Sequence, residues 1–205
     1  MNNTNWSLHT KFLHLGLVIT VTAQLLLSLV MSEPGHKNGI LGHYAYEMHE
    51  VIGLTALAIV LIHWAWSMLS KQEGGIKRFF PIGAQGRALV VEDIKNIFRR
   101  NFSAINEKGL PSLIQGLGLL AVTAAAMSGF FIFLTLPETG KPGNVAKGFM
   151  EFHEEITTFV WIYWVGHGGA AMLHHFSGSD IVRRMFNFNS DDSTKNTVSQ
   201  NPIHH

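Results

Sequence analysis

The chain has 205 residues, of which only 14% are charged, and its mean hydropathy is positive at +0.18. This composition is typical of a membrane protein rather than a soluble domain, and a formal net charge of +1 gives no indication of nucleic-acid binding. The chain contains no cysteine. It therefore excludes disulfides, thiolate metal sites, cysteine-ligated iron–sulfur clusters and haem attached covalently through cysteine within this chain.

Four stretches of the sequence are apolar and long enough to cross a bilayer as helices, which requires about 20 residues each. In chain order they cover residues 12–31, 46–70, 112–136 and 151–176. We therefore expect an all-α integral membrane protein, a four-transmembrane-helix bundle. The bundle would form one domain over residues 1–186, and the polar tail, 187–205, is expected to be disordered.

The segments between the predicted spans differ in composition. Residues 32–45 are rich in Gly and Pro and predict a short loop, whereas residues 71–109 are polar and contain eight Lys and Arg residues. Four apolar residues of the second segment have helical spacing: Val90, Ile94, Ile97 and Phe98. This spacing favours a helix that lies on the membrane surface, although a solvated basic loop is the alternative. The basic segment is also a surface where a redox partner protein could dock.

The distribution of basic residues predicts the orientation in the membrane. Twelve of the fifteen Lys and Arg residues lie before the first span, within residues 71–109 or after the fourth span, and three lie in the other two loops. Lys and Arg accumulate on the cytoplasmic side of membrane proteins. Both chain termini are therefore expected to be cytoplasmic.

Histidines at membrane depth are the main functional candidates, because ionisable residues inside spans are usually functional. His153 and His167 lie fourteen residues apart in the fourth span, which is about 21 Å along one helix face. His49 lies near the same outer surface as His153, whereas His14 and His63 lie toward the inner surface. The histidines thus form an outer layer, His49 with His153, and an inner layer, His167 with His14 or His63. A hydrogen-bonded structural histidine is the alternative at each position.

Two histidine layers contributed by facing helices suit two stacked cofactors in a helix bundle. Without cysteine, haem would be held non-covalently as two b haems, each with two axial imidazoles and no open position for oxygen. A zinc or copper conduit fits less well. Neither His49-Glu50 nor His153-Glu154 continues to the second histidine of an H-E-x-x-H zinc motif.

Several sequence motifs surround these histidines. They are LHLG at His14, YEMHEVIGL at His49, FHE at His153, VGHGGAAMLHH at His167, and then DIVRRMF. With these motifs the chain resembles the bacterial cytochrome b561 family, within the group that includes hydrogenase-type b cytochromes, over about residues 10–186. The resemblance implies a multi-pass protein of the bacterial inner membrane that holds two b haems. It implies haem ligation by His49 and His153 outside and by His14 and His167 inside.

His63 departs from the family pattern. Many members have an arginine at this place, which can meet a haem propionate. His63 also follows His49 by fourteen residues, so spacing alone allows His63 rather than His14 to pair with His167. The resemblance favours His14 and makes His63 a propionate partner or a structural residue. Three basic residues on the inner side are further candidates for propionate pairing: Lys11, Arg183 and Arg184.

Two glutamates, Glu50 and Glu154, each follow a proposed outer ligand. They could accept protons at a quinol site, or only hydrogen-bond the axial imidazoles and tune the reduction potential. Three functions remain open from the sequence. The first is transmembrane electron transfer linked to the quinone pool, and the second is a haem-bearing anchor subunit of a larger dehydrogenase or hydrogenase. The third is a histidine-lined metal or haem transporter.

Overall fold

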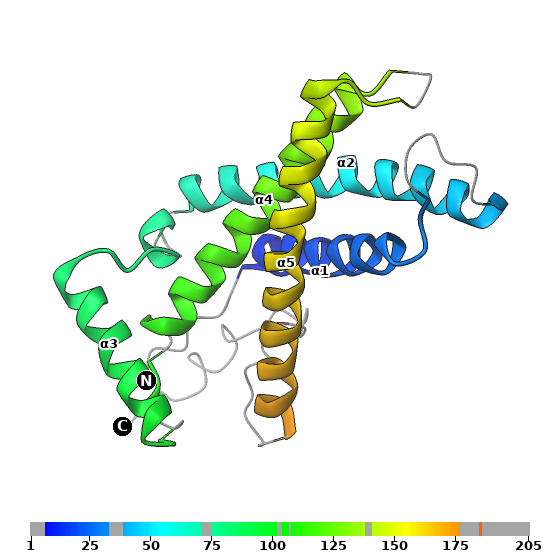
Figure 1. Cartoon of the computed structure of the whole chain (residues 1–205). Helices are drawn as coiled ribbons and strands as arrows, with labels where there is room; N and C mark the ends of the chain where they lie inside the picture. The colour runs from blue at the N-terminus through cyan, green and yellow to red at the C-terminus, as the bar shows by residue number, and fades with distance from the viewer. Residues whose placement is uncertain are drawn as a thin grey trace, which may run out of the picture.

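The structure is a computed structural model that describes residues 7–32, 39–70, 75–101, 104–106, 108–137, 141–176 and 185. Every regular element within these ranges is a helix, as the sequence predicted (Figure 1). In chain order the elements are α1 (Leu8–Ser28), α2 (Gly39–Leu69), the short 3-10 helix η2 (Gly75–Arg78), α3 (Ala84–Phe98), α4 (Leu110–Thr135) and α5 (Asn144–Phe176). The predicted tail lies outside the described residues.

Local sequence signals explain where α1 and α4 begin. The side chain of Ser7 caps α1, because its Oγ accepts a hydrogen bond from the backbone N–H of Thr10 at 3.3 Å. Such a cap supplies a partner to an amide that has none inside the helix. Pro111 lies in the first turn of α4, where the N–H that proline lacks would have no helical partner.

The two helices that carry the outer histidines begin earlier than the sequence predicted. The loop expected over residues 32–45 is shorter, since α2 already begins at Gly39. No proline lies between Pro34 and the predicted start of this span, so the helix can extend toward its N-terminus. Similarly, α5 begins at Asn144, directly after Pro142 and Gly143. Both helices are therefore longer than the apolar stretches they contain.

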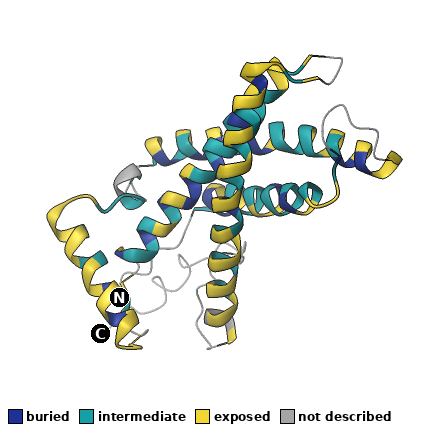
Figure 2. Ribbon diagram, in the orientation of Figure 1, coloured by how far each residue is buried: buried dark blue, intermediate teal, exposed yellow. Residues whose placement is uncertain are grey.

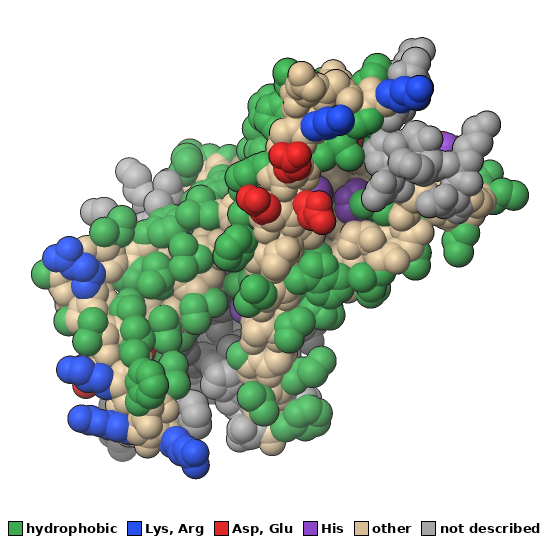
Figure 3. All heavy atoms as spheres, in the orientation of Figure 1, with side chains coloured by type: hydrophobic (Ala, Val, Ile, Leu, Met, Phe, Trp, Pro, Cys, Tyr) green, Lys and Arg blue, Asp and Glu red, His purple; other side chains and the backbone are tan. Residues whose placement is uncertain are grey.

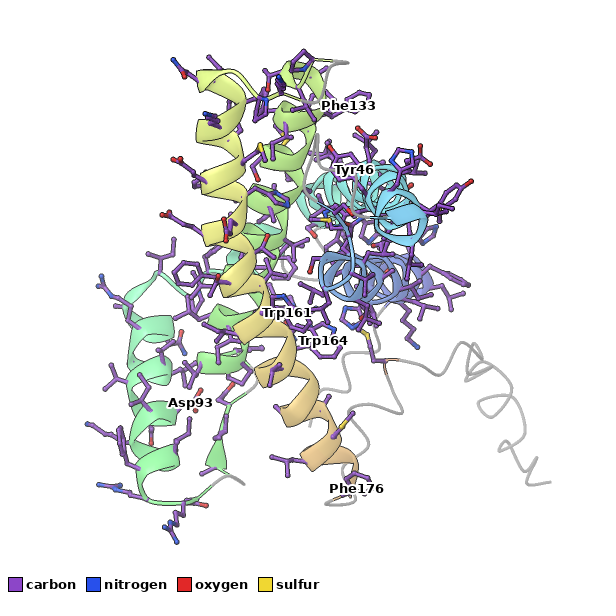
Figure 4. The ribbon with its side chains drawn as sticks, turned by 45° about the vertical axis from the view of Figure 1, so that its right-hand side comes forward. Tyr46, Asp93, Phe133, Trp161, Trp164 and Phe176 are labelled. Carbon is purple, nitrogen blue, oxygen red and sulfur yellow. The ribbon has the colours of Figure 1, made fainter. Side chains whose placement is uncertain are left out.

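The helices form two antiparallel hairpins. α1 packs on α2, α4 packs on α5, and the hairpins meet mainly through α2 and α4. Figures 1 and 4 show that the hairpins cross steeply rather than run side by side. The buried apolar core lies at this crossing (Figure 2), and its members are Leu25, Leu57, Val60, Leu119, Val122 and Val160. The crossing brings α5 over residues of both α1 and α2.

Three helices of the described part of the chain, α1, α2 and α4, are long and apolar enough to cross a membrane. α5 contains the predicted fourth span but is not among the three. Its uncharged part includes three histidines, three glycines, two tryptophans and one tyrosine, which lower its hydropathy. Large apolar side chains are exposed on all four helices, for example Ile19, Ile62, Phe133 and Phe159. Figure 3 shows apolar side chains over much of one face. Such an apolar exterior suits contact with lipid.

α3 lies beside the beginning of α4 (Figure 1) and buries polar rather than apolar side chains. The carboxylate of Asp93, which is 1% exposed, accepts hydrogen bonds from the backbone N–H groups of Asn106 at 2.9 Å and Leu110 at 2.8 Å (Figure 4). These bonds hold α3 against the start of α4. Three of the four apolar residues predicted to face the membrane surface are exposed: Ile94, Ile97 and Phe98.

Candidate cofactor-binding site

The outer histidines come together at the crossing of α2 and α5. The ring centres of His49 and His153 are 6.2 Å apart, and the ring planes are inclined by 82°. Nδ1 of His153 is within hydrogen-bond distance of two atoms on α4, the carbonyl oxygen of Ala125 at 3.0 Å and Oγ of Ser128 at 2.9 Å. Nδ1 of His49 is buried and has no hydrogen-bond partner among the described residues. An imidazole nitrogen of this kind is a ready ligand.

The inner layer pairs α1 with α5. The ring centres of His14 and His167 are 6.3 Å apart, with the ring planes inclined by 72°. One turn before His167, the ring of Tyr163 stacks on its imidazole at 5.1 Å and 17°. The indole N–H of Trp164 donates to Thr22 on α1 at 2.9 Å and joins the two helices near this pair (Figure 4).

The ring separations in both pairs match those of two ligands on one metal ion. Each metal–imidazole bond is about 2 Å long and each ring nitrogen lies about 1 Å from its ring centre, so two axial imidazoles have centres about 6 Å apart. The steep angle between the planes is compatible with this arrangement, because each ring can rotate about its own metal–nitrogen bond. The donor chemistry and the spacing of both pairs therefore fit haem.

Three glycines beside His167 leave the backbone of α5 uncovered by side chains of their own. A Cβ added at Gly166, Gly168 or Gly169 would meet no atom of the described structure within 4 Å. Small residues of this kind allow a planar group to approach a helix closely. In the described part of the chain, no group of three or more His, Asp or Glu side chains could hold a metal ion. Paired imidazoles rather than multi-residue cages are thus the ligand sets that the structure offers.

His63 occupies a different environment from the paired histidines. It is 8% exposed, and its ring contacts the ring of Phe79 with centres 6.2 Å apart. It also lies close enough to His14 to interact with it electrostatically. His63 is thus a neighbour of the inner pair, and its role as the rival ligand stays a prediction.

The candidate propionate partners are only partly described. Lys11 is on α1, three residues before His14, and is 9% exposed. Arg183 and Arg184 lie outside the described residues. The position of Lys11 near the inner pair is compatible with the predicted pairing.

Acidic side chains gather beside the outer pair. Glu50 is half-buried on α2 and Glu154 is exposed on α5. Figure 3 shows acidic side chains together on one face, with histidine visible beside them. A shallow, open depression on α5 is lined by Glu151, Glu154, Glu155 and Thr158. Carboxylates therefore lie on the surface next to the outer pair, and the roles predicted for Glu50 and Glu154 stay predictions.

Some residues that support the site were not predicted from the sequence. The side chain of Gln24 on α1 donates to the backbone carbonyl of His49 at 2.5 Å, and Ser128 and Ala125 contact His153. The only signal in the sequence is a set of small residues, Ala124–Ala126, Ser128 and Gly129, which suits close helix packing. Its smallness also allows an imidazole to reach the backbone of α4.

Comparisons with known proteins agree with the geometry of the site. Residues 5–188 match the family described as Prokaryotic cytochrome b561, which covers all the helices described above. Neither a search of curated proteins nor a search of solved structures gave a match. The chain therefore belongs to the prokaryotic cytochrome b561 family, whose members are membrane proteins that bind b-type haem and transfer electrons.

Proposed function

We propose that this protein carries electrons across the bacterial inner membrane through two bis-histidine b haems. His49 and His153 would hold the outer haem, and His14 and His167 would hold the inner haem. The observation that carries the proposal is the ring-centre separation of 6.2 Å in one pair and 6.3 Å in the other. A haem iron with two axial imidazoles exchanges one electron and has no open position for oxygen.

The ring contacts favour His14 over His63 as the inner ligand. Its ring faces that of His167, whereas the ring of His63 packs against Phe79. His63 would then be a partner for a propionate or for the inner ligands, as would Lys11. A buried, polar neighbour of this kind can stabilise a charged group that is otherwise far from water.

The proposed topology has four spans with both termini in the cytoplasm. α1 has 21 residues and α4 has 26, so each is at least about 30 Å long, which is the thickness of the hydrocarbon core. α2 and α5 have 31 and 33 residues and would extend beyond it or tilt.

The outer side would exchange electrons with a quinol. Oxidation of a quinol releases protons with the electrons, so its site needs bases within hydrogen-bond reach of the hydroxyl groups. Glu50 and Glu154 follow the two outer ligands, and the depression beside Glu154 is open to solvent. The alternative role as an anchor subunit of a larger dehydrogenase or hydrogenase rests on the basic segment 71–109, whose helix α3 exposes apolar side chains.

The test is a count of haem together with ligand substitutions. The purified protein should contain two haems per chain, both low-spin and extractable with acid-acetone. The variant His14→Ala should lose the inner haem or convert it to high spin, whereas His63→Ala should keep two low-spin haems with one shifted potential. His43→Ala is the matched control, since His43 is exposed at the start of α2. A single haem in the wild type, or exchanged behaviour of the first two variants, would contradict the proposed ligands.

A further inference from the structure

Three polar atoms meet where His153 packs on α4. Nδ1 of His153 lies 2.9 Å from Oγ of Ser128 and 3.0 Å from the carbonyl oxygen of Ala125. Oγ of Ser128 is itself 2.9 Å from the same carbonyl oxygen. The three atoms form a closed triangle of hydrogen bonds between α4 and α5. Ser128 is only 3% exposed, so water has little access to it.

One hydroxyl proton and one ring proton are available for the three contacts of this triangle, which limits the possible hydrogen-bond directions. The carbonyl oxygen has no proton to give, and the hydroxyl group has one. If Ser128 donates to the carbonyl of Ala125, then Nδ1–H of His153 donates to that carbonyl and to Oγ. If Ser128 donated to Nδ1 instead, the carbonyl would lose both side-chain donors and the ring proton would move to Nε2. The first arrangement makes a hydrogen bond of each of the three short contacts, and it leaves the lone pair of Nε2 for a metal.

The small residues of α4 make this contact possible. A Cβ placed on Gly129 would already touch the ring of His153, with Cε1 at 3.4 Å. A larger residue at Gly129 would therefore move the imidazole away from the carbonyl of Ala125. The triangle thus depends on a close approach of the imidazole to the backbone of α4, and not on a chance surface contact.

On the basis of the proposed function, we infer that Ser128 is a positioning residue for His153. The carbonyl of Ala125 holds His153 in the tautomer that ligates through Nε2, and Ser128, as a second acceptor of Nδ1–H, orients the ring and increases the electron donation of the imidazole to the iron of the outer haem. Partners that accept the second N–H of a ligating histidine raise its basicity, and their loss changes metal affinity or activity about 10- to 100-fold. Stronger donation favours the oxidised iron, so Ser128 lowers the reduction potential of the outer haem.

The inference is tested by redox titration of the purified protein with both haems bound. In Ser128→Ala, Nδ1–H keeps the carbonyl of Ala125 but loses the hydroxyl oxygen as an acceptor. We expect one of the two haems to become easier to reduce by about tenfold, which is about 59 mV for a one-electron couple. The other haem should keep its potential. Ser128→Thr, which retains the hydroxyl group, should restore the wild-type value.

The control is Thr135→Val on the same helix, because Thr135 is exposed and its hydroxyl donates only to carbonyls of α4. It should leave both potentials unchanged. Equal shifts of both haems, no shift, or failure of Ser128→Thr to restore the potential would overturn the role of Ser128. If Ser128→Ala does not accumulate, Ser128→Cys, with its weakly accepting sulfur, should give the same selective shift. Wild-type protein that purifies without haem would instead refute the proposed function.

Discussion

Removal of the Asp93 carboxylate should loosen the junction between α3 and α4. In Asp93→Ala, the amides of Asn106 and Leu110 lose the acceptor that they reach at 2.9 Å and 2.8 Å. A hydrogen bond to a charged group contributes about 1.5–3 kcal/mol net, so two such bonds contribute about 3 kcal/mol at the lower limit. Asp93→Asn keeps one acceptor oxygen and should lose about half of this free energy.

Hydrogen–deuterium exchange measures this junction directly. A loss of about 3 kcal/mol corresponds to about a hundredfold larger population of the opened state, which would show as faster exchange at Asn106 and Leu110. The rates should rise in the order wild type, Asp93→Asn, Asp93→Ala. Glu92→Ala is the control, since Glu92 is the exposed neighbour on the same helix. If Asp93→Ala exchanged no faster than Glu92→Ala, the two bonds would not be holding α3 in place.

Two further predictions concern the surroundings of the two histidine pairs. Replacing both Glu50 and Glu154 by Gln should slow reduction of the outer haem by a quinol analogue and abolish the pH dependence of the rate; a rate that only follows the haem potential would assign these glutamates to tuning. Gly118→Ala should perturb the spectrum of the inner haem, because the new Cβ would overlap the ring of Tyr163. The overlap lowers the free energy of unfolding by about 1–3 kcal/mol, and the higher helix propensity of Ala offsets roughly 1 kcal/mol of this loss. Gly148→Ala, where a Cβ meets no atom of the described structure within 4 Å, should leave both haem spectra unchanged, and an altered spectrum there would contradict the packing argument.

One part of the histidine arrangement could be predicted because it depends on the local geometry of a single helix. A spacing of fourteen residues places His153 and His167 on one face of α5. The structure brings a histidine of α2 to the first and a histidine of α1 to the second. Their roles as ligands stay predictions. The choice between His14 and His63 could not be made from spacing, since both lie at similar depth; the family motif favoured His14, and the inner ligand stays a prediction.

The hydrogen-bond partners of the histidines could not be predicted. The contacts of His153 with Ala125 and Ser128 depend on the rotation of α4 about its own axis, which a run of small residues does not specify. The orientation of α3 shows a related limit of hydrophobic periodicity. The apolar pattern predicted a helix on the membrane surface, and the structure leaves Ile94 exposed, but the pattern gave no sign that Asp93 is buried. When the surroundings are lipid, an apolar face no longer indicates the protein interior.

α5 contributes one histidine to each pair, and it is the last described helix of the chain. A ribosome makes α1, α2 and α4 before α5, and domains are synthesised from the N-terminus onward. With the proposed ligands, a nascent chain therefore has one histidine of each pair in the membrane before the second histidine of either pair is made. Bis-histidine ligation at both layers must wait until α5 is inserted, so maturation of the two sites would be a single late event. A chain truncated before Asn144 would bind neither haem in this way.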